Sequence, residues 1–154
     1  MCRILVLICI FFQHAVYADD ASNPTAPKSE AAVIDLRNAT WEQGQAFSLD
    51  GLWNSYWNEF VLPSQVNETR LEPEAFPVPA MWGDRSLEGY VRPSQGYMTY
   101  HLQVLVPKHL KDIHMYIPDM PSAYKLWVNE KLEAQNGTPG KSQETEEPNF
   151  RPRV

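Results

Sequence analysis

The chain has 154 residues and a formal net charge of −6, with 44% hydrophobic and 12% aromatic residues. This length suits one domain with a packed core, and an acidic chain without a basic patch argues against nucleic acid as a partner. Proline outnumbers glycine by 13 to 7, which favours a loop-rich β domain over a helical bundle. Both cysteines, Cys2 and Cys9, lie near the start, so we expect no disulfide in the mature fold and no thiolate zinc site.

The first eighteen residues have the layout of a secretory signal. Arg3 supplies the charged start, and Ile4–Phe12 is an apolar run too short to cross a bilayer. Small residues then precede a cleavage point after Ala18. We expect residues 1–18 to be a cleaved signal peptide and the product to be periplasmic or secreted, with an uncleaved membrane anchor as the alternative.

Residues 19–45 predict a linker followed by an edge strand. Asp19–Ala32 is rich in Ala, Ser, Pro and Asp and has no periodicity, as in a mobile linker. Val33–Leu36 would form a short edge strand, and Asn38–Gln45 a loop. The main domain is therefore expected over residues 46–154.

Two patterns fit Leu52–Leu62. Leu52, Tyr56 and Phe60 form a helical stripe with i, i+4 spacing, while part of the segment alternates strictly. The β-propensity of the aromatic residues and the turn signal Asp50-Gly51 favour a strand. Bulky rings on both sides of this strand would require that both of its faces are covered.

The region Pro63–Gly96 is interrupted by five prolines and shows no clear period. We expect it to be an irregular segment that wraps one end of the domain. Loops of this length in a compact domain are functional or cover the core. Trp82 would pin the segment in place.

The strongest strand signals lie between residues 96 and 137. Tyr97–Val106 alternates, with Met98, Tyr100, Leu102, Val104 and Val106 on one face. Ser122–Glu130 alternates in the same way, with Tyr124, Leu126 and Val128 on one face. Asp112–Pro118 is interpreted as a third strand because Ile113, Met115 and Ile117 alternate. Three strands joined by short turns predict an antiparallel all-β sandwich.

Several motifs occur in a characteristic order: Leu49-Asp50-Gly51-x-Trp53, Tyr56-Trp57, Val78-Pro79-x-x-Trp82, Gly96-Tyr97-x-Thr99-Tyr100, Ile117-Pro118 and Ser122-Ala123-Tyr124-x-Leu126-x-Val128-Asn129. Together they resemble the extracytoplasmic sensor domain of bacterial seven-transmembrane receptors with diverse intracellular signalling modules. More loosely, they resemble the sugar-binding domain of family-two glycoside hydrolases. The resemblance spans about residues 47–153 and implies a galactose-binding-like jelly-roll β-sandwich.

The chain departs from the family pattern at two points. The family has glycine where this chain has Glu130, so the hairpin turn is expected to be less tight or to strain Glu130. In the family, further strands, membrane helices and an output domain follow the segment that matches Pro148–Arg153. The resemblance therefore implies a C-terminally incomplete jelly roll, linked to a membrane only through downstream segments, with full-length relatives in the inner membrane.

The sequence shows no pattern typical of catalysis. It has no Gly-x-Ser-x-Gly elbow, no Glu-x-x-His pair and no phosphate-binding glycine loop, so we expect no enzyme activity and no cofactor. His101 and His114 would hold a metal with Asp112 only if two neighbouring strands brought them together. Solvated, outward-facing histidines are the simpler interpretation, and no metal is expected.

The loop that contains Glu144, Glu146 and Glu147 is interpreted as a solvated tether rather than a calcium site.

A binding role has better support than an enzymatic one, because sugar sites combine aromatic faces with groups that hydrogen-bond to hydroxyls. The candidate ligand-binding residues are Trp82, Glu88, Arg92, Tyr97, Trp127 and Asn129. For each tryptophan the alternative is core packing or burial under a loop, and for Asn129 it is a turn role.

The sequence thus predicts a non-enzymatic ligand-sensing domain of a membrane signalling receptor. Its partner would be a small molecule, with a carbohydrate as the expected ligand. Two alternatives stay open: a carbohydrate-binding accessory domain of a glycoside hydrolase, and a structural β module for protein contacts.

Overall fold

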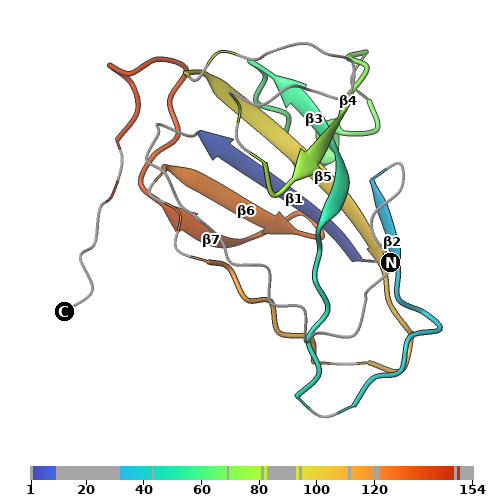
Figure 1. Ribbon diagram of the computed structural model, residues 1–154. Coiled ribbons are helices and arrows are strands. Elements are labelled where there is room, and N and C mark those ends of the chain that lie inside the picture. Colours follow the sequence, from blue (N-terminus) through green and yellow to red (C-terminus); the bar gives the residue numbers. More distant parts are fainter. Residues whose placement is uncertain are drawn as a thin grey trace.

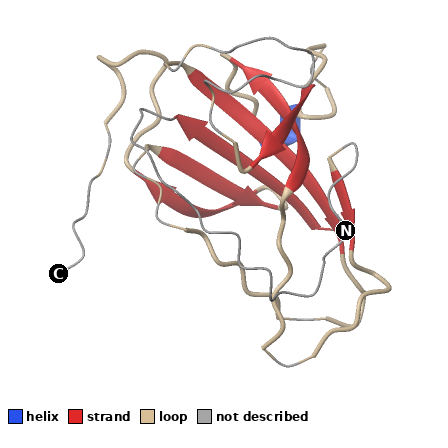
Figure 2. Ribbon diagram, viewed as in Figure 1, coloured by secondary structure: helices blue, strands red, loops and turns tan. Residues whose placement is uncertain are grey.

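The computed structural model describes residues 2–9, 32–42, 44–68, 70–80, 82, 93, 95–110, 112–118, 120, 122–147 and 149, with backbone pairing alone for residues 2–9. This part of the chain is mostly β, which confirms the predicted fold class at that level (Figures 1 and 2). The strands are β1 (Cys2–Cys9), β2 (Val33–Asp35), β3 (Gly51–Trp57), β4 (Glu74–Val78), β5 (Tyr97–Leu105), β6 (Tyr124–Val128) and β7 (Lys131–Asn136). A short 3-10 turn, η1, covers Pro63–Gln65. No helix within the described residues has the length and apolar content needed to cross a membrane.

Strand β5 is the centre of a curled, mixed, four-stranded sheet. It pairs antiparallel with β3, which pairs antiparallel with β4 in turn. β2 runs parallel to the last residues of β5, with Val33 beside Gln103. Because β3 pairs with residues 98–101 and β2 with residues 103–105, the two strands follow one another along β5.

Strands β6 and β7 form a separate hairpin, and β1 lies between it and β5 (Figure 1). β1 runs antiparallel to both neighbours, with Cys9 beside Tyr97 and Ile4 beside Val128. Among the described strand pairs, those of β1 alone connect the hairpin to the four-stranded sheet. Apart from β1, the architecture is a mixed sheet plus a hairpin, and these pairings do not define a jelly roll.

The alternation in β5 is confirmed. Met98, Tyr100, Leu102 and Val104 are buried in the core cluster. Thr99, on the opposite face, is also buried. Its Oγ1 donates to the carbonyl of Glu59 at 2.7 Å and accepts from the N–H of Val61 at 3.0 Å, which holds the segment after β3 over this face. Residues 59–61 therefore cover the face that the alternation alone would leave to solvent.

The preference for a strand after Asp50-Gly51 is also confirmed by β3. Trp53 and Tyr56 point to opposite faces, and both are buried. Nε1 of Trp53 donates to the carbonyl of Leu49 at 2.8 Å, which satisfies the one polar atom of its side chain. Both faces of this strand are covered, as its rings on both sides require.

The prediction of a strand over Asp112–Pro118 is wrong. The segment has no regular structure, and Ile113 and Tyr116 are exposed, the latter at 88%. Alternation shows that a segment is able to bury one face, but a strand also needs a neighbour to pair with. Within the described residues, no strand pairs with this segment. His114 therefore lies in an exposed loop and is not a cross-strand neighbour of His101.

Strand β4 lies inside the region that the sequence predicts to be irregular. Pro77 stands within this strand, and proline is expected to exclude a central strand. β4 lies at the edge of the sheet and pairs with β3 alone among the described strands, so the missing N–H of Pro77 costs little. Strand β4 contributes to the core through Phe76, whose buried ring has its centroid 5.8 Å from that of Tyr100.

The turn between β6 and β7 is tight. Val128 pairs with Lys131, so the turn has only Asn129 and Glu130 at its centre. Both have positive φ, 50° for Asn129 and 73° for Glu130. Of the two outcomes expected at this turn, the structure has the strained one, in which Glu130 adopts a conformation that favours glycine.

The core begins well before residue 46. Ile34 and Leu36 are buried in the same cluster as Leu102. Nε1 of Trp41 donates to the carbonyl of Leu36 at 3.1 Å, and its ring packs on Phe47 at 4.8 Å. The second half of the segment predicted as linker and edge strand is thus anchored to the core by side chains.

Candidate functional site

Trp82 lies in the core rather than on a binding surface. Its exposed fraction is 1%, and its Nε1 donates to the hydroxyl of Tyr100 at 2.8 Å. Its ring meets that of Trp57 edge-on, with centroids 4.9 Å apart. Trp82 pins its segment to the sheet, as expected, but in this position the indole has no face open for a sugar ring.

The other sequence candidates do not gather at one place. Tyr97 begins β5, whereas Trp127 is half-buried near the far end of β6. Asn129 occupies the tight turn beyond it. Tyr97 is level with Cys9 and Val128 is level with Ile4, which separates the two ends by roughly 17 Å at ~3.3 Å per residue. Glu88 and Arg92 lie outside the described residues.

Tyr97 belongs to a cluster of two rings and a cation. Its ring centroid lies 4.6 Å from that of Phe60, and both residues are half-buried. Nζ of Lys141 lies 5.8 Å from the centroid of Phe60 and 5.9 Å from that of Tyr97. These distances suit cation–π attraction. We call these three residues the aromatic–lysine cluster.

Phe60 reaches Tyr97 because the backbone after β3 is held against the start of β5. The N–H of Asn58 donates to the carbonyl of Tyr97 at 2.8 Å, and Asn58 turns the chain with a φ of 56°. The two hydrogen bonds of Thr99 then hold residues 59 and 61 on either side of Phe60. The ring pair is therefore set by fixed backbone, which lowers the entropy cost of presenting it to a ligand.

Lys141 is presented by a closed loop over residues 138–147. Thr138 and Glu147 exchange two backbone hydrogen bonds, of 2.8 and 3.0 Å, at the base of this loop. Inside it, the carbonyl of Ser142 accepts from the N–H groups of Thr145 and Glu146. Hereafter this is called the 138–147 loop.

Within this loop Glu144 and Glu147 are exposed, as expected for a solvated tether, but Glu146 is buried. Its exposed fraction is 9%, and burial raises the pKa of its carboxyl, while a hydrogen bond from the backbone N–H of Ala123 acts in the opposite direction. Oε1 of Glu146 is buried without a hydrogen-bond partner among the described residues. Glu146 thus fastens the loop to the start of β6 rather than extending into water.

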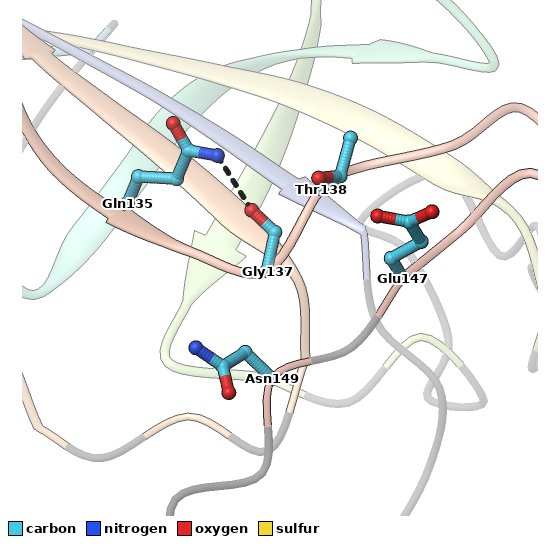
Figure 3. A pocket seen from close by; sticks show the side chains of 5 residues that line it. All are labelled: Gln135, Gly137, Thr138, Glu147 and Asn149. Atoms are coloured by element: carbon cyan, nitrogen blue, oxygen red, sulfur yellow. Dashed lines mark hydrogen bonds between the residues drawn. The ribbon is translucent and has the colours of Figure 1, made fainter.

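A shallow polar pocket, largely open to solvent, lies beside the loop and has a volume of about 490 Å³. Figure 3 shows the residues that surround it: Gln135, Gly137, Thr138, Glu147 and Asn149. Nε2 of Gln135 donates to the carbonyl of Gly137 at 2.7 Å, which orients the amide at the pocket wall. The lining offers amide, hydroxyl and carboxylate groups, which are the partners that sugar hydroxyls use.

The pocket and the aromatic–lysine cluster lie at the same end of the sheet. Asn136, the last residue of β7, pairs with Tyr124, which is level with Ile8 of β1. Tyr97 is level with the next residue, Cys9. The 138–147 loop borders both features, since Lys141 and Thr138 belong to it. Sequence reasoning identified Tyr97 but missed Phe60, Lys141 and the pocket residues.

The arrangement is suited to binding by stacking and hydrogen bonds. Within the described residues, no group of three or more His, Cys, Asp or Glu side chains is placed to hold a metal ion.

Comparison of the chain with protein-family models, with curated proteins and with solved structures found no match.

Proposed function

We propose that the protein is an exported, non-enzymatic ligand-binding domain whose ligand is a carbohydrate. The observation that carries the proposal is the pair of half-buried rings of Phe60 and Tyr97, 4.6 Å apart, with the Lys141 ammonium beside both. The apolar C–H face of a pyranose would stack on these rings, while the pocket, which lies across β1 and β6 from β5, would take the hydroxyls of a second sugar unit.

In this proposal the domain is the sensor of a bacterial membrane receptor and, when complete, a galactose-binding-like jelly roll. The order of motifs from Leu49 to Asn129 supports this, as do the strands β3, β5 and β6 at the places where those motifs lie. The predicted signal at residues 1–18 would direct the domain to the periplasm. A ligand would then act by binding one receptor state more tightly than another.

Calorimetry and NMR titration with a panel of mono- and disaccharides test the proposal. We expect a saccharide whose binding shifts the resonances of Phe60, Tyr97 and Lys141, and whose affinity falls by about tenfold in Tyr97→Ala because one stacking face is lost. Trp127→Ala is the matched control, since it removes a half-buried ring from the far end of β6. Absence of binding by every saccharide, or an equal loss of affinity in both variants, would contradict the proposal.

A further inference from the structure

Strand β1 occupies a position that holds the sheet together. Residues 97–104 of β5 pair with it on one side, and residues 124–128 of β6 on the other. Because β1 is antiparallel to both, β5 and β6 run parallel to each other with one strand between them. At ~4.8 Å per strand spacing, their edges without β1 would stand roughly 10 Å apart, the width that one strand fills. We call this space the β1 slot.

The two faces of the β1 slot differ in chemistry. On one face it is flanked by Tyr100 and Leu102 of β5 and by Leu126 of β6, all buried in the core. On the other face it is flanked by Thr99, His101 and Gln103 of β5 and by Lys125 and Trp127 of β6, a mixture of polar and aromatic side chains. An occupant therefore needs apolar side chains at alternate positions on the core face, and tolerates polar ones between them.

Gln103 indicates what an occupant should carry at one position. Its Nε2 is buried and has no hydrogen-bond partner among the described residues. The residue opposite it in register is Arg3. An arginine side chain carries donors only and is unable to accept from this amide. An occupant with Asn, Asp or Ser at that position would satisfy a buried donor that is otherwise left unpaired.

We propose that the β1 slot is a strand-acceptor site for a partner polypeptide. Residues 2–9 fill it in the precursor, and after cleavage behind Ala18 an extended segment of the partner replaces them. The segment runs antiparallel to β5 and β6, is apolar at alternate positions, and carries an acceptor side chain opposite Gln103. The proposal rests on the export step of the proposed function and is independent of its sugar site.

A second copy of this chain is a poorer donor than a separate partner. The described strands of such a copy are already paired within its own sheet. An empty slot is also unfavourable, because it leaves two strand edges with unpaired N–H and C=O groups beside buried apolar side chains. Addition of a strand from a partner satisfies both edges at once.

The test uses the full chain with a specific protease site placed in residues 19–31, so that it folds with residues 2–9 in place before it is cut. The probe is a labelled peptide with the sequence of Cys2–Cys9 and serine in place of both cysteines. A control peptide carries Val6→Pro, because Val6 pairs with both Tyr100 and Leu126 and proline removes its N–H. A third peptide carries Arg3→Asn.

After the cut, we expect the labelled peptide to exchange into the chain, one per chain, and to slow amide exchange in β5 and β6. The proline peptide should bind at least about tenfold more weakly, and the Arg3→Asn peptide several-fold more tightly. Equal binding of the proline peptide would reveal non-specific apolar adhesion and overturn the proposal. So would a cut chain that takes up no peptide, whether it keeps its own segment, stays folded without it, or aggregates.

The proposed function can fail separately from this proposal. Saccharide titration is done on the uncut chain, so it does not depend on exchange in the slot. The N-terminal residue of the exported chain, read by mass spectrometry, reports the cleavage itself. An exported chain that retains residues 2–9 would overturn their replacement by a partner, whereas peptide exchange after the engineered cut tests the slot separately from sugar binding.

Discussion

The four-stranded sheet and the β6–β7 hairpin are held in place in different ways. The sheet is buried from both sides, with Leu102 fully buried on its core face and Thr99 on the other. In the hairpin, Leu126 is buried, but Leu132 on β7 is 45% exposed. The sheet is therefore stabilised by packing, whereas the hairpin depends on its neighbours, β1 and the segment before β6.

Polar contacts also stabilise the hairpin, which is less completely packed than the sheet. Nδ2 of Asn136 donates to the carbonyls of Ser122 and Met120, at 2.9 and 3.4 Å. Glu146 accepts from the N–H of Ala123 nearby. The start of β6 is thus fixed by an amide and a carboxylate, and the carboxylate makes this contact sensitive to pH.

The largest expected difference between the two regions is the cost of removing a leucine. Leu102→Ala should lower the free energy of unfolding by about 2–5 kcal/mol, because it removes a fully buried side chain and leaves a cavity. Leu132→Ala, its match in the hairpin, should cost less than about 0.5 kcal/mol since the side chain is half exposed. Urea denaturation measures both, and equal costs would show that the two regions are packed alike.

The next effect concerns the hydrogen bond that ties the Trp82 segment to the sheet. Tyr100→Phe removes the acceptor of the Trp82 N–H and leaves a buried donor unpaired. We expect a loss of about 1–3 kcal/mol in the free energy of unfolding. Tyr124→Phe, on the half-buried β6, is the control and should be close to neutral. A neutral Tyr100→Phe would mean that the donor finds another acceptor.

Strands are predicted correctly from the sequence where apolar residues alternate with a period of two and a neighbouring strand is present to pair with the segment. The prediction succeeds for β5 and β6 for that reason. It fails for Asp112–Pro118, where the alternation is present but no described strand lies alongside. It misses β4 for the opposite reason, because Pro77 weakens the signal and only its place at the sheet edge makes proline acceptable.

The candidate site is less predictable than the strands. Tyr97 could be selected because it begins a clear strand. Phe60 and Lys141 come to it through the hydrogen bonds of Thr99 and the closed 138–147 loop, and no periodicity in the sequence encodes these contacts. The burial of Glu146 has no sequence signal either, since it stands in a run of polar and acidic residues.

The hairpin turn offers a smaller, stabilising change. Glu130 has a φ of 73°, a conformation that costs a residue with a Cβ about 1 kcal/mol and costs glycine little. Glu130→Gly should therefore raise the free energy of unfolding by up to about 1 kcal/mol, and Glu130→Ala should not. A gain of equal size in both variants would point to charge rather than to backbone conformation.

The smallest expected effect is the pH dependence that Glu146 gives to the hairpin side of the molecule. Its pKa in the folded state is raised above the ordinary value of 4.5 by burial, so the folded state binds this proton more tightly than the unfolded state does. Below pH 4.5 the carboxyl is protonated in both states and has no effect. As the pH rises through the raised pKa, the folded state must hold a buried charge, and stability falls.

Glu146→Gln keeps the shape of the side chain and removes its charge, so the difference in unfolding free energy between variant and wild type should grow in favour of the variant as the pH rises from 4 towards 7. Asp35 shows the reverse dependence, because the guanidinium of Arg37 lowers its pKa to about 2, but it is present in both proteins and cancels in the difference. A difference that does not vary with pH would mean that Glu146 is solvated in the folded protein. The 138–147 loop would then lack its carboxylate contact with the start of β6.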